Sequence, residues 1–286
     1  MSGGRWRPGA ALSSGRRTGP PANVAALAAG AWLAVMVLLS LVPGLEAAAL
    51  AQDIAAGVSP PGSPGHLLGT DDLGRDVALL TLAGARTAIA GPVAIAAGSM
   101  AIGLLAGLVA AYRPGAVDWT VSRVVDVLLA LPSLLLAIVV AGVIGGGYWI
   151  SVAVFVVLYA PYDVRLVRAA ALARINDPFL EAARLLGLPR WRILLRHLFP
   201  VIRGLVGANL FLNMAYALVS LSSLSFLGLG ISPQAADWGR QLSDARTLMF
   251  SNPGAALAPG VAIILTAVAL NLVGDWIAER SGVGEE

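Results

Sequence analysis

The chain lacks two residue types on which much protein chemistry depends, because its 286 residues include neither cysteine nor lysine. Without cysteine, disulfides and thiolate metal sites are excluded. Without lysine, there is no Walker A lysine to contact the phosphates of ATP and no amine to form a Schiff base. All 19 basic residues are therefore arginine. If ATP drives this protein, it must be hydrolysed on another chain.

Charged residues are scarce: they make up 12% of the chain, against 58% hydrophobic residues and a mean hydropathy of +0.81. A soluble domain averages about a quarter charged residues, so the lipid bilayer is the expected solvent. The net charge of +3 and the pI near 9.8 would point to nucleic acid in a soluble protein. In a membrane protein, the simpler explanation is that arginines gather on one side of the bilayer.

Long charge-free runs give the predicted membrane spans. A helix needs about 20 mostly apolar residues to cross roughly 30 Å of hydrocarbon. The run 127–162 is too long for one crossing, and Gly145, Gly146 and Gly147 at its middle predict a turn. The sequence therefore predicts an all-α integral membrane protein with six transmembrane helices, near 22–44, 88–112, 124–144, 148–166, 205–229 and 256–277.

The arginines also predict the orientation of these spans. If the N-terminus is cytoplasmic, 15 arginines lie inside and only four lie outside, namely Arg75, Arg86, Arg240 and Arg246. By the positive-inside rule, both termini are then cytoplasmic. The predicted order is a cytoplasmic tail (1–21), a first anchor (22–44), an external segment (45–87), a membrane domain (88–279) with a cytoplasmic loop (167–203), and a cytoplasmic tail (280–286). A cleavable signal peptide is the alternative for the first span.

The stretch DPFLEAARLLGLPRW (177–191) is an apolar segment within the predicted cytoplasmic loop. Asp177 as N-cap and Pro178 at the first position begin a helix, which Gly187 and Pro189 end. A helix of about ten residues is too short to be stable alone and needs a surface to pack on. That surface is a partner protein, the membrane, or the chain's own helix ends. The predicted docking face comprises Phe179, Ala182, Ala183 and Leu186, with Glu181 and Arg184 at its edge.

The outer segments hold a second group of candidates. Thr70 or Asp71 is expected to cap a helix that has Asp72 in its first turn. The string TDDLGRD lacks the spacing of a Ca²⁺-binding loop, so its charged residues are expected to cap the helix and form a salt bridge. Trp238 and Phe250 suit the membrane interface. His66 and His197 fall on opposite sides of the membrane, which excludes a shared metal site.

Ionisable residues near the cytoplasmic span ends form a third group. Such residues are functional candidates by default, because charge is costly at that depth. The expected structural role of Asp126, Asp163 and Asp275 is pairing with Arg123, Arg165 or Arg168. Prolines inside spans kink the helix or open its backbone next to a pathway; they are Pro92, Pro132 and Pro161.

Four motifs carry a resemblance to a known family. EAARLLGLPRWRILLRHLFP (181–200) resembles the EAA loop of permease subunits of ATP-binding-cassette (ABC) importers. HLLGTDDLGRDV (66–77), VDVLLALPSLLLA (125–137) and LSFLGLGISPQAADWG (224–239) are similar to the dipeptide/oligopeptide/nickel permeases, and within them to the DppC/OppC type. The ending GDWIAE departs from the GDGLRD-like ending of that family. The resemblance covers most of the chain after residue 66.

The resemblance implies a fold, a set of partners and several residue roles. The fold would be that of a type I ABC importer permease in the bacterial cell membrane. The partners would be a homologous DppB/OppB-type permease, two ABC ATPases and an external substrate-binding protein. No cofactor or metal would lie on this chain, and ATP and Mg²⁺ would bind the partner ATPases. The short helix would couple to an ATPase through Phe179, Glu181, Ala182, Ala183, Leu186 and Gly187.

The family also implies roles for residues outside the EAA loop. Asp72, Arg75, Asp76 and Trp238 are candidates for contact with the binding protein or for the outer gate, and Asp126 and Pro132 are candidates for the substrate pathway. The chain would be a non-catalytic subunit that forms half of a pathway for dipeptides or oligopeptides. Nickel or a haem-type compound is the alternative cargo, since the sequence does not name one. An ion-driven secondary transporter is the alternative class, although five charge-free runs argue against it.

Overall fold

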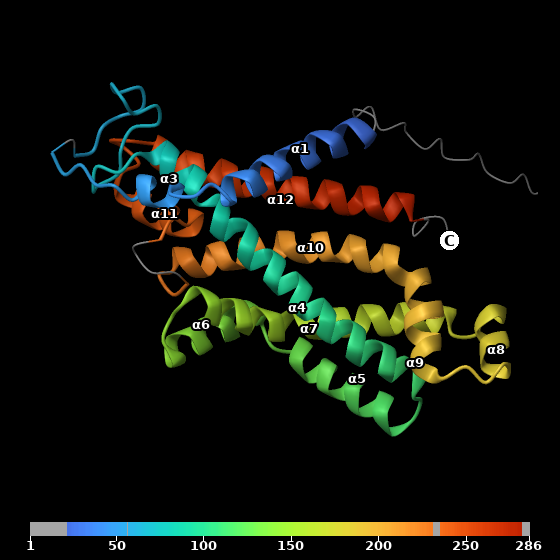
Figure 1. Ribbon diagram of the computed structural model, residues 1–286. Helices are drawn as coiled ribbons and strands as arrows, with labels where there is room; N and C mark the ends of the chain where they lie inside the picture. Colours follow the sequence, from blue (N-terminus) through green and yellow to red (C-terminus); the bar gives the residue numbers. More distant parts are fainter. Residues whose placement is uncertain (1–21, 56, 231–234, 282–286) are drawn as a thin grey trace, which may run out of the picture.

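The computed structural model describes residues 22–55, 57–230 and 235–281, and every regular element in these ranges is helical. The predicted tail at 1–21 and nearly all of the tail at 280–286 lie outside them. The long helices are α1 (Ala22–Ser40), α4 (Ala85–Tyr112), α5 (Ala116–Leu129), α6 (Ser133–Ile144), α7 (Tyr148–Arg174), α10 (Phe199–Phe226) and α12 (Gly254–Arg280). In Figure 1, α1, α7, α10 and α12 run roughly along one direction, and α4 crosses them obliquely.

Short elements gather at the two ends of this bundle. At one end lie α2 (Leu45–Ala49), α3 (Val77–Ala83), α11 (Trp238–Asp244) and the 3₁₀ turn η2 (Ala245–Thr247). At the other end lie α8 (Pro178–Leu185), α9 (Arg190–Arg192) and the π-helix η1 (Ile193–Leu198). The first turn of α1 and the last turn of α12 lie toward the end that carries α8 (Figure 1). We call the end with α3 and α11 the outer end, and the end with α8 the inner end.

The predicted all-helical membrane fold is confirmed. Five stretches of the described chain are long and apolar enough to cross a membrane, and α5 with α6 provides a sixth candidate span. The turn predicted at the three glycines also forms, because α6 ends at Ile144 and α7 begins at Tyr148. The inner ends of the helices extend past the predicted bounds: α7 continues to Arg174, and α10 already begins at Phe199.

The predicted span 124–144 is not one straight helix. α5 and α6 meet at a break of three residues, Ala130, Leu131 and Pro132, and their axes differ by 80°. The physical cause is the proline, which has no backbone N–H and disfavours helical geometry at the residue before it. Apolar composition predicted the location of this segment in the membrane. The proline within it indicated a kink but not its size.

The most extensive helix contact joins α4 and α7, and glycines on α4 make it close. A Cβ added at Gly103 would lie 2.5 Å from Cβ of Asp163, and one at Gly107 would lie 2.9 Å from the carbonyl oxygen of Val164. A Cβ at Gly98 would lie 2.9 Å from a methyl carbon of Val156. Small residues allow two membrane helices to approach backbone to backbone, where dispersion forces are strongest.

A buried carboxyl group lies at this contact and links it to α10. Asp163 is fully buried, and its Oδ1 accepts hydrogen bonds of 2.7 Å from Nδ2 of both Asn209 and Asn213. The predicted pairing of Asp163 with an arginine is therefore wrong. Helix periodicity directs Asp163 toward α4 and α10, whereas Arg165, two residues later, emerges on another side of α7. Asp275 is exposed on α12 and forms no ion pair with any described residue.

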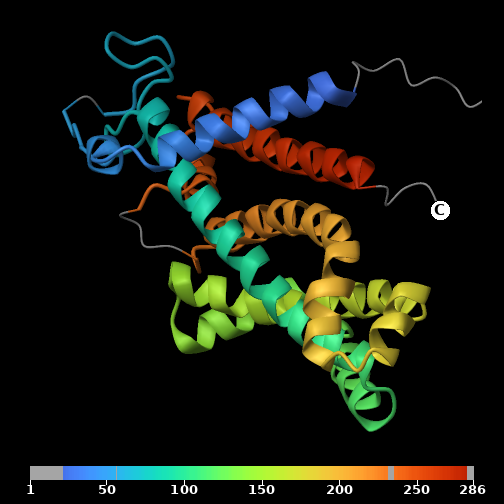
Figure 2. The ribbon, with the colours of Figure 1, turned by 45° about the vertical axis from the view of Figure 1, so that its right-hand side comes forward.

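α1 packs along α12 at the side of the bundle (Figure 2). Trp32 donates through its indole N–H to the hydroxyl of Thr266 at 3.1 Å. Met36 is buried in a cluster that also contains Ala85, Leu218 and Ala262. The first helix is thus held against the rest of the bundle by both polar and apolar contacts.

The contact between α4 and α7 generates a stability prediction. Gly103→Ala should lower the unfolding temperature of the protein, because the added methyl group has no room against Asp163. Overpacking of this kind costs about 1–3 kcal/mol. The measurement is thermal unfolding of the detergent-purified protein.

The matched control is Gly142→Ala on α6, another helical glycine, where an added Cβ meets no atom within 4 Å. Because alanine favours helix by up to about 1 kcal/mol over glycine, this control should be neutral or stabilising. Equal stability of the two variants would show that α4 and α7 are not in backbone contact.

Candidate functional site

The short helix α8 begins and ends as the sequence predicts. Asp177 is the N-cap and Pro178 the first helical residue, although the Asp177 side chain makes no capping hydrogen bond. Gly187 adopts a φ of +71°, the left-handed conformation that glycine favours. Its N–H donates to the carbonyl of Arg184, and the N–H of Leu188 donates to the carbonyl of Ala183. These two bonds form a Schellman motif, which closes the helix after eight residues rather than the expected ten.

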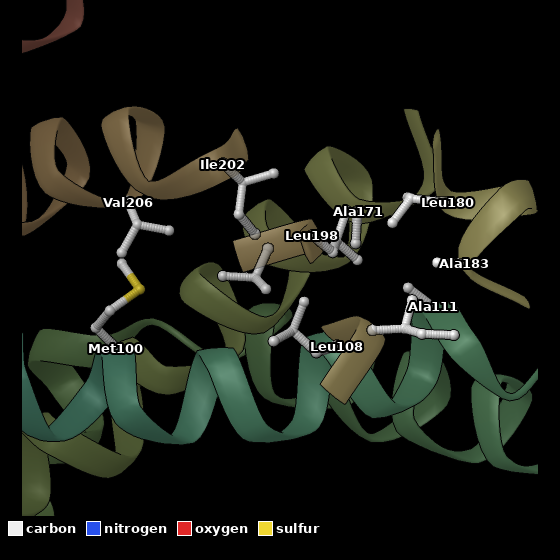
Figure 3. Packing of buried hydrophobic residues seen from close by; sticks show 11 residues of the cluster. Met100, Leu108, Ala111, Ala171, Leu180, Ala183, Leu198, Ile202 and Val206 are labelled. Atoms are coloured by element: carbon white, nitrogen blue, oxygen red, sulfur yellow. The ribbon is translucent and has the colours of Figure 1, made fainter. Parts of the chain in front are cut away.

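One face of α8 packs on the chain itself. Leu180 and Ala183 are buried in a cluster to which α4, α7, η1 and α10 all contribute. Figure 3 shows these two side chains beside Ala111, Ala171 and Leu198. The prediction that Ala183 belongs to the docking face is therefore wrong. Ala183 is three residues after Leu180, so the two share the inner side of the helix.

The opposite face of α8 has no cover within the described chain. Leu185 and Leu186 are 89% and 79% exposed, and Phe179 is also exposed. Ala182, Glu181 and Gly187 lie on the surface as well. Sequence reasoning missed Leu185, although its position three residues after Ala182 would have placed it on this side. We call the exposed side formed by Phe179, Ala182, Leu185 and Leu186 the outer face of α8. The name refers to this helix alone and not to the outer end of the bundle.

Arginine–aromatic contacts hold the loop around α8 to the end of α4. The guanidinium carbons of Arg184 and Arg190 lie 5.4 and 5.9 Å from the ring centre of Tyr112, the last residue of α4. Arg184 also donates to the carbonyl oxygen of Ile175 at 2.9 Å. Cation–π contacts contribute about 0.5–1 kcal/mol each at exposed sites. After α8, the short α9 and the π-helix η1 continue directly into α10, so α8 is connected by short segments to both α7 and α10.

At the outer end, the string DDLGRD forms a tight loop and not a helix. Arg75 is buried and donates through Nε to Oδ2 of Asp71 at 2.6 Å, and its backbone N–H donates to Oδ1 of the same carboxylate. The helix starts later than predicted, because the N-cap of α3 is Asp76, whose Oδ1 accepts from the N–H of Leu79 at 2.9 Å. The expected capping and salt bridge are thus present, but other members of the string provide them.

Two outer candidates are structural in this arrangement. Trp238 is buried, and its indole N–H donates to the carbonyl oxygen of Thr81 at 2.7 Å. An added Cβ at Gly84, between α3 and α4, would lie 2.5 Å from this indole ring. Because Trp238 and Arg75 are buried, they are not available to an external protein here, whereas Asp72 is exposed. Phe250, on the same end, is fully exposed as expected for an interface residue.

The residue before Trp238 is also a buried acid. Asp237 is the N-cap of α11, and its Oδ1 accepts from the N–H of Arg240 at 3.0 Å. Burial raises the pKa of this carboxyl above its usual value, while the hydrogen bonds from Arg240 and from Ser225 act in the opposite direction. Thr87 binds the carbonyl oxygen of the neighbouring Ala236 at 3.2 Å, so this stretch is tied to the start of α4.

The pathway candidates lie on the broken span formed by α5 and α6, and one of them contacts α7. Arg165 donates through Nη2 to Oδ1 of Asp126 at 2.7 Å, which confirms the predicted pairing of Asp126. One turn further along α7, Arg168 makes a bidentate contact of 2.5 and 2.7 Å with Asp118. Pro132 stands at the break that follows α5. The structure thus places Asp126 and Pro132 on the same broken span.

The described residues contain no group of three or more histidine, aspartate or glutamate side chains that could hold a metal ion. His66 pairs with Asp76 at 2.8 Å at the outer end, and His197 lies near the inner end, where its Nδ1 is 3.2 Å from the carbonyl oxygen of Arg192.

Comparison with known proteins identifies the family. Residues 101–282 match the family described as the inner membrane component of binding-protein-dependent transport systems. The glutathione transport system permease protein GsiD of Pectobacterium atrosepticum is 36% identical over 217 residues, which cover 76% of this chain and 72% of the relative. The dipeptide transport system permease protein DppC of Alkalihalophilus pseudofirmus is 31% identical over 75% of this chain and 70% of the relative.

A third relative is the di/tripeptide transport system permease protein DppC of Pseudomonas aeruginosa, 33% identical over 76% of this chain and 72% of its own length. These matches agree with the DppC/OppC-type resemblance and disfavour an ion-driven secondary transporter. The chain belongs to the family of inner membrane components of binding-protein-dependent transport systems, and it is a permease subunit of an ABC importer.

Proposed function

We propose that this chain forms half of a membrane pathway through which short peptides are imported. The support comes from the relatives, whose names give glutathione, dipeptides and di- or tripeptides as their cargoes. Most such molecules carry an ammonium and a carboxylate group on a flexible backbone. Nickel and haem-type compounds, the other cargoes open from the sequence, are not named by these relatives.

The outer face of α8 is the proposed contact for a separate ATPase subunit. The observation that carries this proposal is the pair of almost fully exposed leucines, Leu185 and Leu186, on a helix whose other face is locked into the chain's own core. Burial of each leucine in a partner's groove would contribute about 1.5–3 kcal/mol. Motion of the ATPase would then reach α7 and α10 through the short segments that flank α8.

The remaining assembly follows from this assignment. The partners are a homologous permease, two ABC ATPases that bind ATP and Mg²⁺, and an external substrate-binding protein. α8 and both termini lie in the cytoplasm, in agreement with the excess of arginines at the inner end. At the outer end, exposed Asp72 and Phe250 are the proposed contacts for the binding protein. No cofactor or metal is assigned to this chain.

The first test is recovery of partner ATPases with the affinity-tagged chain from its native membrane. The double variant Leu185→Ala/Leu186→Ala should lose the ATPases, because it removes most of the apolar area of the outer face. It should keep the second permease, which contacts other surfaces. The co-purifying proteins are identified by mass spectrometry.

The control for this test is Leu67→Ala, which removes a leucine of similar exposure from the outer end and should retain every partner. Undiminished recovery of ATPases with the double variant would exclude the outer face of α8 as the contact. If the wild-type chain brings down no ATPase at all, the proposed assembly itself is wrong.

The second test concerns the end of α8. Gly187→Val should abolish ATP-driven peptide uptake by membrane vesicles, because a β-branched residue strongly disfavours the φ of +71° that ends the helix. Gly187→Asn should retain much of the uptake, since asparagine tolerates left-handed geometry. No atom lies within 4 Å of the added Cβ, so the difference reports backbone strain rather than a clash. Equal uptake by the two variants would show that the shape of this turn does not matter for coupling.

A further inference from the structure

An exposed ion pair joins α5 and α7 near the inner ends of the predicted spans 124–144 and 148–166. The side chains of Arg165 and Asp126 are 62% and 48% exposed, although they bind each other at 2.7 Å. Asp126 lies about 15 Å along α5 from Ala116, and Arg165 about 14 Å along α7 from Arg174, at 1.5 Å per residue. Both helices continue past the pair toward the inner end, so the pair lies inside the helical bundle, where exposed charges are expected to face water rather than lipid.

Polar side chains on two neighbouring helices extend this feature toward the middle of the bundle. Tyr162 is one turn from Arg165 on the same side of α7, and it is exposed. Tyr216 on α10 is also exposed. About one turn along each helix from these tyrosines, the hydroxyl groups of Tyr159 and Ser220 meet at 2.8 Å and join α7 to α10. We call Asp126, Arg165, Tyr162 and Tyr216 the polar stripe.

The charged end of the polar stripe opens into a hollow between α5 and α7. The hollow has a volume of about 310 Å³, and its lining includes Asp126, Arg165 and Arg168. The two arginines differ in their remaining capacity for hydrogen bonds. Both oxygens of Asp118 bind Arg168, whereas Arg165 donates to Asp126 from Nη2 alone among the contacts of the described chain. A guanidinium has five N–H donors, so Arg165 retains donors for a second carboxylate.

We propose that the polar stripe is part of the wall of the translocation pathway, and that Arg165 binds the terminal carboxylate of a peptide in transit. Asp126 binds the ammonium group of the same peptide, so contacts with the peptide replace the contact between Arg165 and Asp126. Tyr162 and Tyr216 offer hydroxyl groups to the peptide backbone, which every cargo of this class shares. This assignment of the peptide termini rests on the proposed function.

The absence of cysteine allows a direct test, because a single introduced thiol is the only one on this chain. Tyr162→Cys is compared with Val157→Cys in the purified importer complex without its external binding protein. The two positions on α7 are 55% and 56% exposed, and they point about 140° apart around the helix. A membrane-impermeant maleimide should label Tyr162→Cys much faster than Val157→Cys, with labelling of this chain read by mass spectrometry.

The peptide contact is tested by protection of the same thiol. An alanine dipeptide should slow labelling of Tyr162→Cys, and its C-terminal amide should protect about tenfold less well, since it cannot form the charge-assisted bonds to Arg165. Adding Arg165→Gln should make the two compounds protect equally. Leaving out the binding protein ensures that any preference arises within the membrane subunits.

The outcomes separate this inference from the proposed function. Labelling of Tyr162→Cys no faster than that of Val157→Cys would overturn the assignment of the stripe to the pathway. Equal protection by dipeptide and amide in the presence of Arg165 would overturn the carboxylate contact. ATP-driven uptake is measured in parallel with the complete system. If that system carries no peptide, the proposed cargo fails, and the rate of labelling alone still decides whether the stripe faces water.

Discussion

In a bilayer, two helices gain little from burying apolar side chains against each other, because the surrounding lipid is as apolar as they are. α4 and α7 are instead held by the fit of their backbones, which Gly98, Gly103 and Gly107 permit. The carboxyl group of Asp163, packed against Gly103, then binds two asparagines of α10. These contacts set the positions of α7 and α10, and the chain connects α8 to both of these helices.

Much of this arrangement could be predicted from the sequence. Charge-free runs located the spans, and Asp177, Pro178 and Gly187 gave the bounds of α8 to within two residues. These features are local, so composition and capping preferences suffice to find them. The same local rules predicted a kink at Pro132, but the 80° bend depends on how α6 packs afterwards.

The wrong predictions concern which side chains point toward the rest of the folded chain. A short helix has no sequence signal that tells which of two apolar faces meets its own chain, and Ala183 was therefore assigned to the wrong side. Trp238 and Arg75 looked like surface residues because tryptophan suits an interface and arginine is charged. Both are buried, because distant segments provide the partners: Thr81 accepts from the indole of Trp238, and Asp71 satisfies Arg75 within a folded loop.

The two ends of the subunit and its middle use polar groups differently. At the outer end, buried polar side chains such as Asn252, which donates to the carbonyls of Leu68 and Thr70, fix the loops to one another. At the inner end, arginines surround a helix with an uncovered apolar face. In the middle, polar groups are either fully buried, as Asp163 is, or exposed on one side, as Arg165 and Tyr162 are. The buried polar groups hold the helices together, whereas the exposed ones form the proposed wall of the pathway.

The break between α5 and α6 has a consequence for how the subunit is made. Ala130, Leu131 and Pro132 are exposed, and no side chain caps the first turn of α6. Non-helical backbone at membrane depth is tolerated only where protein or water covers it. Ala130 and Leu131 keep their N–H groups bonded to the carbonyls of Asp126 and Leu128, so the backbone that needs cover is the first turn of α6. A copy of this subunit made without that cover would expose polar backbone to lipid, so a neighbouring subunit or water must reach this turn once the chain is inserted.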